Sequence, residues 1–127
     1  MSNRTVEVTV EADPLLVPVV RNVAADLAIR LDLQLDTIAD LRLAVDETCG
    51  LLLARAATPT TLRTRFTLGD GTITARTELC CREGTALPDN GLGWHMLTAL
   101  VRSVRCYHTC GAGGEKLAVI EFTTGDL

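Results

Sequence analysis

The sequence predicts a two-layer α/β (α+β) sandwich in which three helices cover one face of a mixed, mostly antiparallel five-stranded sheet. The first reason is the order of the predicted elements along the chain, β-α-α-β-β-α-β-β. The second is that each predicted strand has one polar face, so the sheet is expected to be covered on a single side. The 127 residues fit one domain, residues 1–127, and the 47% of apolar residues can supply its core.

The first strand and helix are predicted at the N-terminus. Residues 5–11 alternate between valines and Thr or Glu, which is typical of a strand that is buried on one side. Asp13 and Pro14 follow as an N-cap and a first helical residue. Apolar residues then recur at helical spacing from Leu16 to Leu27, which predicts a helix over this segment.

The second helix is expected to begin at Asp36 as its cap and to end at Thr58-Pro59. Leu43, Glu47 and Leu51 recur on a face beside the buried stripe at a spacing of four residues. Glu47 is therefore expected to point beside the core, towards whatever covers that face. The predicted buried stripe consists of Ile38, Leu41, Val45, Cys49 and Leu52.

The rest of the chain alternates between hairpins and one more helix. In chain order we predict a hairpin of residues 60–68 and 72–80, a loop over 81–90, a helix from about 93 to 104, and a hairpin of residues 104–110 and 116–123. The side chains of the first hairpin that are expected to face solvent are Arg63, Arg65, Arg76 and Glu78.

Composition excludes several classes of function. The net charge of −4 argues against a nucleic-acid-binding surface. No apolar run approaches the ~20 residues that span a bilayer, and no signal peptide is visible. The odd number of cysteines, without an export signal, indicates reduced thiols and a cytoplasmic protein. These cysteines are Cys49, Cys80, Cys81, Cys106 and Cys110.

Two segments could carry a binding site. Asp46 and Glu47 form an acidic pair in an apolar run, so they are either a solvated helix edge or carboxylates that need a partner. Gly91-Leu92-Gly93 opens the third helix, where backbone N–H groups suit a phosphate. The alternative is that Asn90 and Gly91 simply cap this helix.

Together, residues 41–51 and 90–97 resemble the nucleotide site of the histidine-kinase-like ATPase (Bergerat) fold, in the version used by anti-sigma factor serine kinases. The segments that carry the resemblance are residues 39–49 and 93–100, and Trp94-His95 is similar to the actinobacterial members. The order and length of the predicted elements match over residues 5–123. The resemblance implies the same fold for this chain.

The resemblance also implies ATP and Mg²⁺ as cofactors, with Glu47 as the base. The family has Asn four residues after this Glu to bind Mg²⁺, and this chain has Leu51, which offers no ligand atom. The family's adenine motif, Asp-x-Gly-x-Gly, aligns with Arg82 to Ala86, where Glu83 is the only carboxylate. A plain strand-to-loop turn is the alternative. The nucleotide-binding candidates are Glu47, Leu51, Glu83, Gly84, Gly91, Leu92 and Gly93.

The function implied by the resemblance is that of an anti-sigma factor with a degraded ATP site. Such a protein is a homodimer that holds a sigma factor away from RNA polymerase, and a STAS-domain antagonist releases it. The sigma-binding surface is expected around the first helix, where the polar candidates are Arg21, Asp26 and Arg30.

Two alternatives remain open. The first is an active serine/threonine kinase that phosphorylates the antagonist, with Glu47 as base. The second is a thiol- or metal-responsive regulator, because Cys106, His108 and Cys110 alternate along one strand and Cys80 or Cys81 could approach from a neighbouring strand. Alternate residues of a strand fan out, however, so thiols in the core or at the sheet edge are the default expectation, without a metal.

Overall fold

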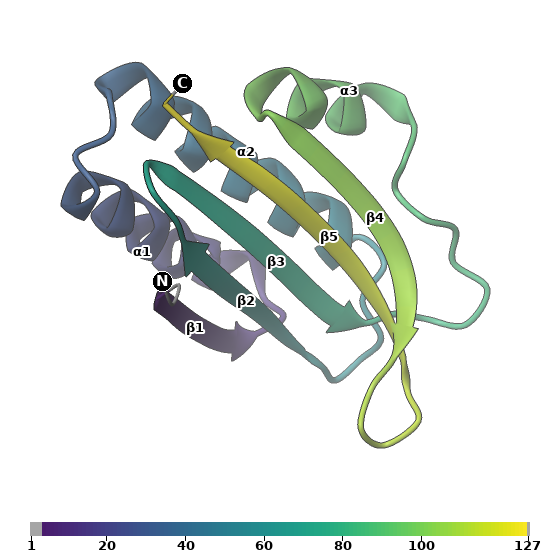
Figure 1. Ribbon diagram of the computed structural model, residues 1–127. Coiled ribbons are helices and arrows are strands. Elements are labelled where there is room, and N and C mark those ends of the chain that lie inside the picture. The colour runs from purple at the N-terminus through teal and green to yellow at the C-terminus, as the bar shows by residue number, and fades with distance from the viewer. Residues whose placement is uncertain (1–3, 127) are drawn as a thin grey trace.

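The computed structural model describes residues 4–126 and confirms the predicted fold class (Figure 1). Five strands form a single sheet, and three helices pack on it. The elements are β1 (Arg4–Glu11), a 3-10 turn (Pro14–Leu16), α1 (Val17–Arg30), α2 (Leu35–Leu53), β2 (Thr61–Leu68), β3 (Thr72–Cys80), α3 (Gly91–Leu100), β4 (Ser103–Cys110) and β5 (Lys116–Gly125).

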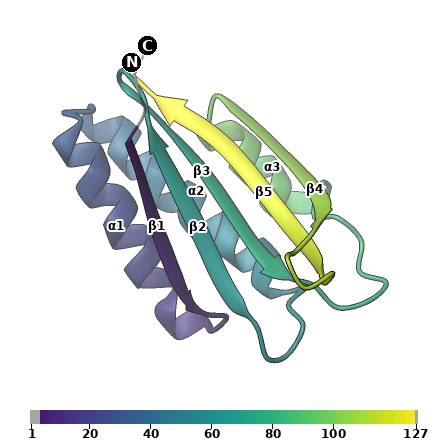
Figure 2. The ribbon, with the colours of Figure 1, turned by 60° about the horizontal axis from the view of Figure 1, so that its bottom comes forward.

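The strand order in the sheet is β1-β2-β3-β5-β4, and every neighbouring pair is antiparallel. The last strand of the chain, β5, lies between β3 and β4, so β4 is at an edge of the sheet. Figure 2 shows all three helices on the same face of the sheet, with the other face uncovered. None of the helices described is long and apolar enough to cross a bilayer.

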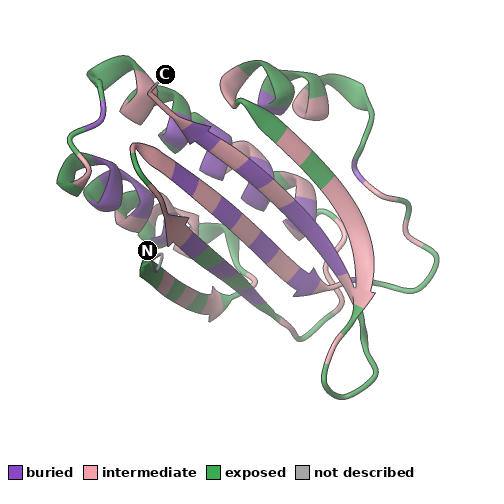
Figure 3. Ribbon diagram, viewed as in Figure 1, coloured by how far each residue is buried: buried purple, intermediate pink, exposed green. Residues whose placement is uncertain are grey.

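The core lies between the sheet and the helices. Alternate residues of the central strands are buried, as the banding along β3 and β5 in Figure 3 shows. The buried row of apolar residues predicted for α2 is confirmed, with Ile38 half-buried at its start. The largest side chains buried from the strands are Leu62, Phe66, Ile73, Leu79, Ile120 and Phe122.

The start of α2 differs from the prediction. The helix begins at Leu35, so Asp36 lies in its first turn and does not cap it. The cap is supplied from the far end of the chain instead. The carboxylate of Asp126 accepts hydrogen bonds from the backbone N–H of Gln34 at 3.0 Å and from Oγ1 of Thr37 at 2.7 Å. A partner so distant in sequence leaves no local signal.

Two other predicted helix boundaries were wrong. Helix α2 ends at Leu53, well before Thr58-Pro59, because the last residues before the proline turn away from the helix. Helix α3 spans Gly91–Leu100 and does not reach residue 104. Val104 instead pairs with Phe122 in the sheet, so strand pairing prevails over the apolar helical pattern at this point.

Candidate functional site

The structure brings Glu47, Leu51 and Gly93 together where α3 crosses α2. A Cβ atom added to Gly93 would lie 3.1 Å from Cδ2 of Leu51 and 3.2 Å from Oε2 of Glu47. Such a close approach of two helices depends on the missing side chain of a glycine. The two sequence segments with the strongest resemblance to a nucleotide site are therefore in direct contact.

The first turn of α3 lies beside a carboxylate. Gly91 has a φ of +89°, a conformation that favours glycine, and the side chain of Asn90 makes no capping hydrogen bond. Oε2 of Glu47 lies beside this turn at Gly93. Because helix N-termini attract anions, the carboxylate and a phosphate would compete for the same region of positive potential.

The residues at this contact do not fit a magnesium-bound triphosphate. Mg²⁺ requires oxygen ligands in near-octahedral geometry, and Leu51 presents only hydrocarbon at the position that faces Gly93. Across residues 4–126, no group of three His, Cys, Asp or Glu side chains is arranged to hold a metal ion. No reaction step through a metal-bound nucleotide follows from these residues.

The other member of the acidic pair, Asp46, faces α1 and has a partner. Nη1 of Arg21 donates to both of its carboxylate oxygens, at 3.1 and 3.2 Å. The ion pair is about one-third exposed and joins α1 to α2. Burial, and secondarily the charge of Asp46, raise the pKa of the Cys49 thiol to about 12. Asp46 therefore has a structural role, in contrast to its neighbour Glu47.

The short loop between β3 and α3 is tied to the C-terminal end of α2. Arg55 donates from Nη1 to the carbonyl of Leu51 at 2.8 Å and from Nε to the carbonyl of Ala86 at 2.9 Å. Arg82 donates from Nη1 to the carbonyl of Ala56 at 3.2 Å. The sequence analysis missed Arg55. Its signal was a cation four residues after Leu51, where the last carbonyls of a helix need donors.

The adenine candidates lie in this loop, beyond the end of α2. Glu83 and Gly84 are both exposed, and Gly84 has a φ of +76° with nothing within 4 Å of an added Cβ atom. The backbone N–H of Arg82 donates to the carbonyl of Arg55. These features are those of a strand-to-loop turn, and a nucleotide role for Glu83 and Gly84 stays a prediction.

The alternative in which Cys80 approaches Cys106 from a neighbouring strand does not occur, because β5 separates β3 from β4. Cys106 pairs with buried Ile120 and faces the helices, whereas Cys80 pairs with Leu117 on the opposite face. Burial raises the pKa of the Cys106 thiol, and the nearby charge of Asp89 adds to the shift. The thiols of the described chain are free and do not converge.

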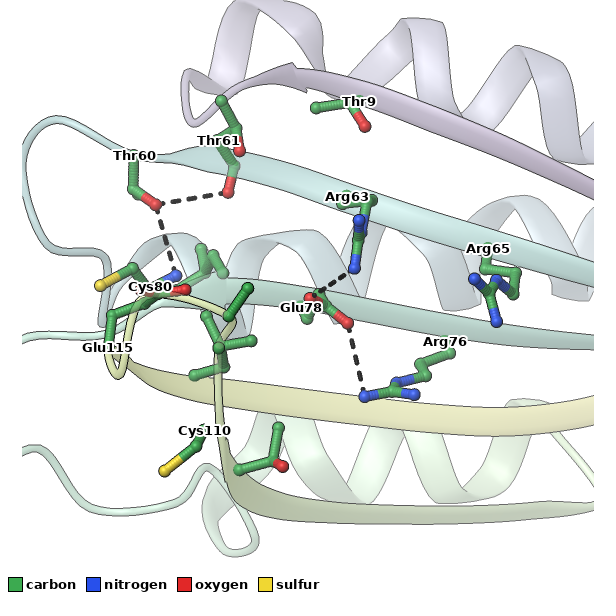
Figure 4. A pocket seen from close by; sticks show the side chains of 15 residues that line it. Thr9, Thr60, Thr61, Arg63, Arg65, Arg76, Glu78, Cys80, Cys110 and Glu115 are labelled. Atoms are coloured by element: carbon green, nitrogen blue, oxygen red, sulfur yellow. Dashed lines mark hydrogen bonds and ion pairs between the residues drawn. The ribbon is translucent and has the colours of Figure 1, made fainter.

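The uncovered face of the sheet contains a hollow of about 630 Å³ (Figure 4). The four side chains predicted to face solvent from the first hairpin all line it. They are largely neutralised by ion pairs. Glu78 pairs with Arg63 at 3.2 Å and with Arg76 at 3.5 Å, while Arg65 pairs with Glu7 of β1.

The polar residues predicted on α1 divide between two sides of the helix. Arg21 faces α2 through its ion pair with Asp46. Asp26 and Arg30 form an exposed pair at 2.8 Å, one turn apart. The hydrogen bond and charge of Asp26 raise the pKa of Arg30. The second pair is the more exposed of the two.

Comparison with known proteins finds homologues for the chain. It is 31% identical over 105 residues to the anti-sigma-F factor RsbW of Mycobacterium tuberculosis, in both the CDC 1551/Oshkosh and the H37Rv strains. The aligned region covers 83% of this chain and 62% of each relative, so the chain spans about three-fifths of their length. No protein-family model matches the chain.

Solved structures with a similar fold include the crystal structure of the RsbU and RsbW domains of Rv1364c from M. tuberculosis, with a TM-score of 0.65 and 19% sequence identity. The match covers 94% of this chain and 33% of that chain. At this identity the likeness concerns the fold alone.

Proposed function

Because this chain is a homologue of the RsbW-type anti-sigma factors, we propose that it is itself an anti-sigma factor, which sequesters an RNA polymerase sigma factor in the cytoplasm. The observation that carries the proposal is the 31% identity over 105 residues. Sequestration needs complementary surfaces and no chemistry, so it does not depend on an intact nucleotide site.

We further propose that the ATP site is degraded and that sigma binding is independent of ATP and Mg²⁺. The support is the contact between α2 and α3, where Leu51 offers no oxygen and the carboxylate of Glu47 lies beside the first turn of α3. Titration of the native protein and of Leu51→Asn with Mg-ATP tests this part. No binding by the native protein is expected, and micromolar binding would contradict it.

The partners and surfaces also belong to the proposal. We propose a homodimer that a STAS-domain antagonist displaces from the sigma factor. On α1, the Asp26–Arg30 pair is the most exposed part of the predicted sigma-binding surface, while Arg21 is partly exposed and pairs with Asp46 of α2. Loss of sigma binding in Asp26→Ala/Arg30→Ala, with an unchanged melting temperature, would support this assignment.

The decisive test is a calorimetric titration of the protein against each purified sigma factor of its source organism. The proposal expects one of them, or a small subset, to bind at micromolar affinity or better. Failure of every sigma factor to bind would overturn it.

An active serine/threonine kinase is the second candidate, and one observation favours it. Glu47 and the Gly-x-Gly turn meet in the fold, as a kinase of this type requires. Transfer of labelled phosphate from Mg-ATP to a purified antagonist, abolished in Glu47→Ala, would establish the kinase. The absence of phosphate transfer would rule out the kinase and leave the anti-sigma binding function as the proposal.

A further inference from the structure

A row of four residues runs along the outer side of α2. Asp36, Asp40, Leu43 and Glu47 follow one another at spacings of four, three and four residues, so they share one side of the helix. We call this row the α2 stripe. Asp36 and Asp40 are exposed, Leu43 is 53% exposed, and Glu47 is half-buried. Within residues 4–126, none of the three carboxylates forms an ion pair.

Helix α3 packs beside α2 and carries two exposed apolar side chains. It runs antiparallel to α2. Near its start, Gly93 lies against Glu47 in the second half of α2. Just after its end, Arg102 donates to the carbonyl of Asp126, whose carboxylate caps the start of α2. Met96, one turn after Gly93 on α3, is 46% exposed, and Leu92 is 77% exposed. On α2 itself, the three carboxylates and the exposed Leu43 share one side of the helix.

This combination of acidic and exposed apolar side chains indicates what kind of partner fits the surface. Carboxylates repel nucleic acid and anionic lipid, and they attract Lys and Arg. An exposed apolar centre flanked by acids complements an amphipathic helix whose apolar face is bordered by basic residues. The stripe extends over 11 residue steps, or about 16 Å, which matches roughly three turns of such a helix.

We propose that the α2 stripe docks a basic amphipathic helix of the sigma factor. The inference rests on the proposed function, because a protein that binds promoter DNA carries basic surface. Two features support it. Asp36 and Asp40 are like charges one turn apart, an arrangement that destabilises an isolated helix unless a cation neutralises it. The Arg21–Asp46 ion pair fixes α1 to α2, so the Asp26–Arg30 pair and the stripe lie on one helical layer that a single partner can cover.

The test compares two variants with the same change of charge. Asp40→Asn/Glu47→Gln removes the carboxylates on either side of Leu43, and Glu11→Gln/Asp70→Asn removes two exposed carboxylates from the sheet layer. The dissociation constant for the sigma factor that binds the native protein is measured without nucleotide over a range of salt concentrations. The stripe variant should bind about tenfold more weakly and with a shallower salt dependence. The control should stay within about twofold of the native protein.

A third variant tests the apolar part, and Leu43→Ala should also weaken binding by about tenfold. Thermal unfolding of each variant checks that it is folded, since Glu47 is half-buried beside Gly93. If the native protein binds a sigma factor and both stripe variants bind it equally well, the stripe is a solvated helix face and only the proposed function survives. If no sigma factor binds the native protein, both proposals fall.

Discussion

At the scale of single residues, Glu47 and Asp46 are adjacent in sequence and differ in what surrounds them. Asp46 faces α1 and pairs with Arg21, whereas Glu47 faces α3 beside Leu51 and Gly93. The difference follows from the ~100° turn between consecutive helical residues, which directs neighbours to different helices. Of this acidic pair, Asp46 forms a structural contact with Arg21, and Glu47 contributes a carboxylate to a candidate interface.

The Arg21–Asp46 pair should contribute measurably to stability. Nε of Arg21 is buried without a hydrogen-bond partner among the described residues, so Asp46→Asn leaves a partly buried guanidinium without its counter-charge. We expect a loss of about 1 kcal/mol in the free energy of unfolding, measured by urea denaturation. Asp26→Asn breaks a more exposed pair and should cost less than Asp46→Asn. Equal losses for the two variants would contradict this account.

The cysteines should differ in their reactivity towards iodoacetamide. The thiolate is the reactive form, and burial holds the pKa of Cys49 at about 12, so this thiol stays protonated at neutral and mildly basic pH. Cys110 is exposed. Mass spectrometry of the native protein at pH 8 should therefore find Cys110 alkylated first and Cys49 unmodified until the protein unfolds. Early modification of Cys49 would show that α2 opens readily.

At the scale of elements, two glycines test how closely α2 and α3 are packed. Gly50 is exposed on α2, with nothing within 4 Å of an added Cβ atom, so Gly50→Ala should stabilise the protein by roughly 0.5–1 kcal/mol. Gly93→Ala gains the same helix propensity but crowds Leu51 and Glu47. Its melting temperature should not rise above that of the native protein. A rise equal to that of Gly50→Ala would mean that the two helices are not in close contact.

The end of β5 and the start of α2 form a second connection between elements. Asp126 satisfies the backbone N–H of Gln34 and the hydroxyl of Thr37. Asp126→Ala should therefore cost about 1 kcal/mol of unfolding free energy, the usual cost of losing a helix cap. Asp70→Ala, in the exposed turn between β2 and β3, is the matched control and should cost less than about 0.5 kcal/mol. No loss for Asp126→Ala would show that water replaces the cap.

The elements themselves were largely predictable, because alternating and helical periodicities are local properties of the sequence. The residues at which the helices begin and end were less predictable from the sequence. The start of α2 is set by Asp126, which is 92 residues away from Gln34, and the end of α3 is set by the pairing of Val104 with Phe122. Contacts of this kind are decided by the tertiary fold, and no local pattern encodes them.

At the scale of the whole molecule, the strand order explains which parts of the candidate site could be predicted. Glu47, Leu51 and Gly93 lie close together because α2 and α3 are neighbours in the fold, and their role in binding a nucleotide stays a prediction. The strand order decides which thiols are neighbours, and it was not predictable from sequence alone. The insertion of β5 between β3 and β4 separates Cys80 from Cys106, which rules out the alternative that Cys80 approaches Cys106 from the neighbouring strand. Arg55 was missed because its partners are backbone carbonyls.

The same view of the molecule separates two faces with different properties. The uncovered face of the sheet carries guanidinium groups that are already paired with carboxylates, as in the hollow of Figure 4. The helical face carries exposed apolar side chains and, on the α2 stripe, carboxylates that form no ion pair within residues 4–126. A protein partner that docks on the α2 stripe therefore breaks no ion pair there.

The central claim is that this protein binds a sigma factor without needing a nucleotide. Its most direct test is the dissociation constant of the complex, measured by calorimetry with and without saturating Mg-ATP. We predict the same micromolar or tighter value in both conditions. Binding that appears only when Mg-ATP is present would contradict the account, since it would require the contact between α2 and α3 to open and hold the nucleotide.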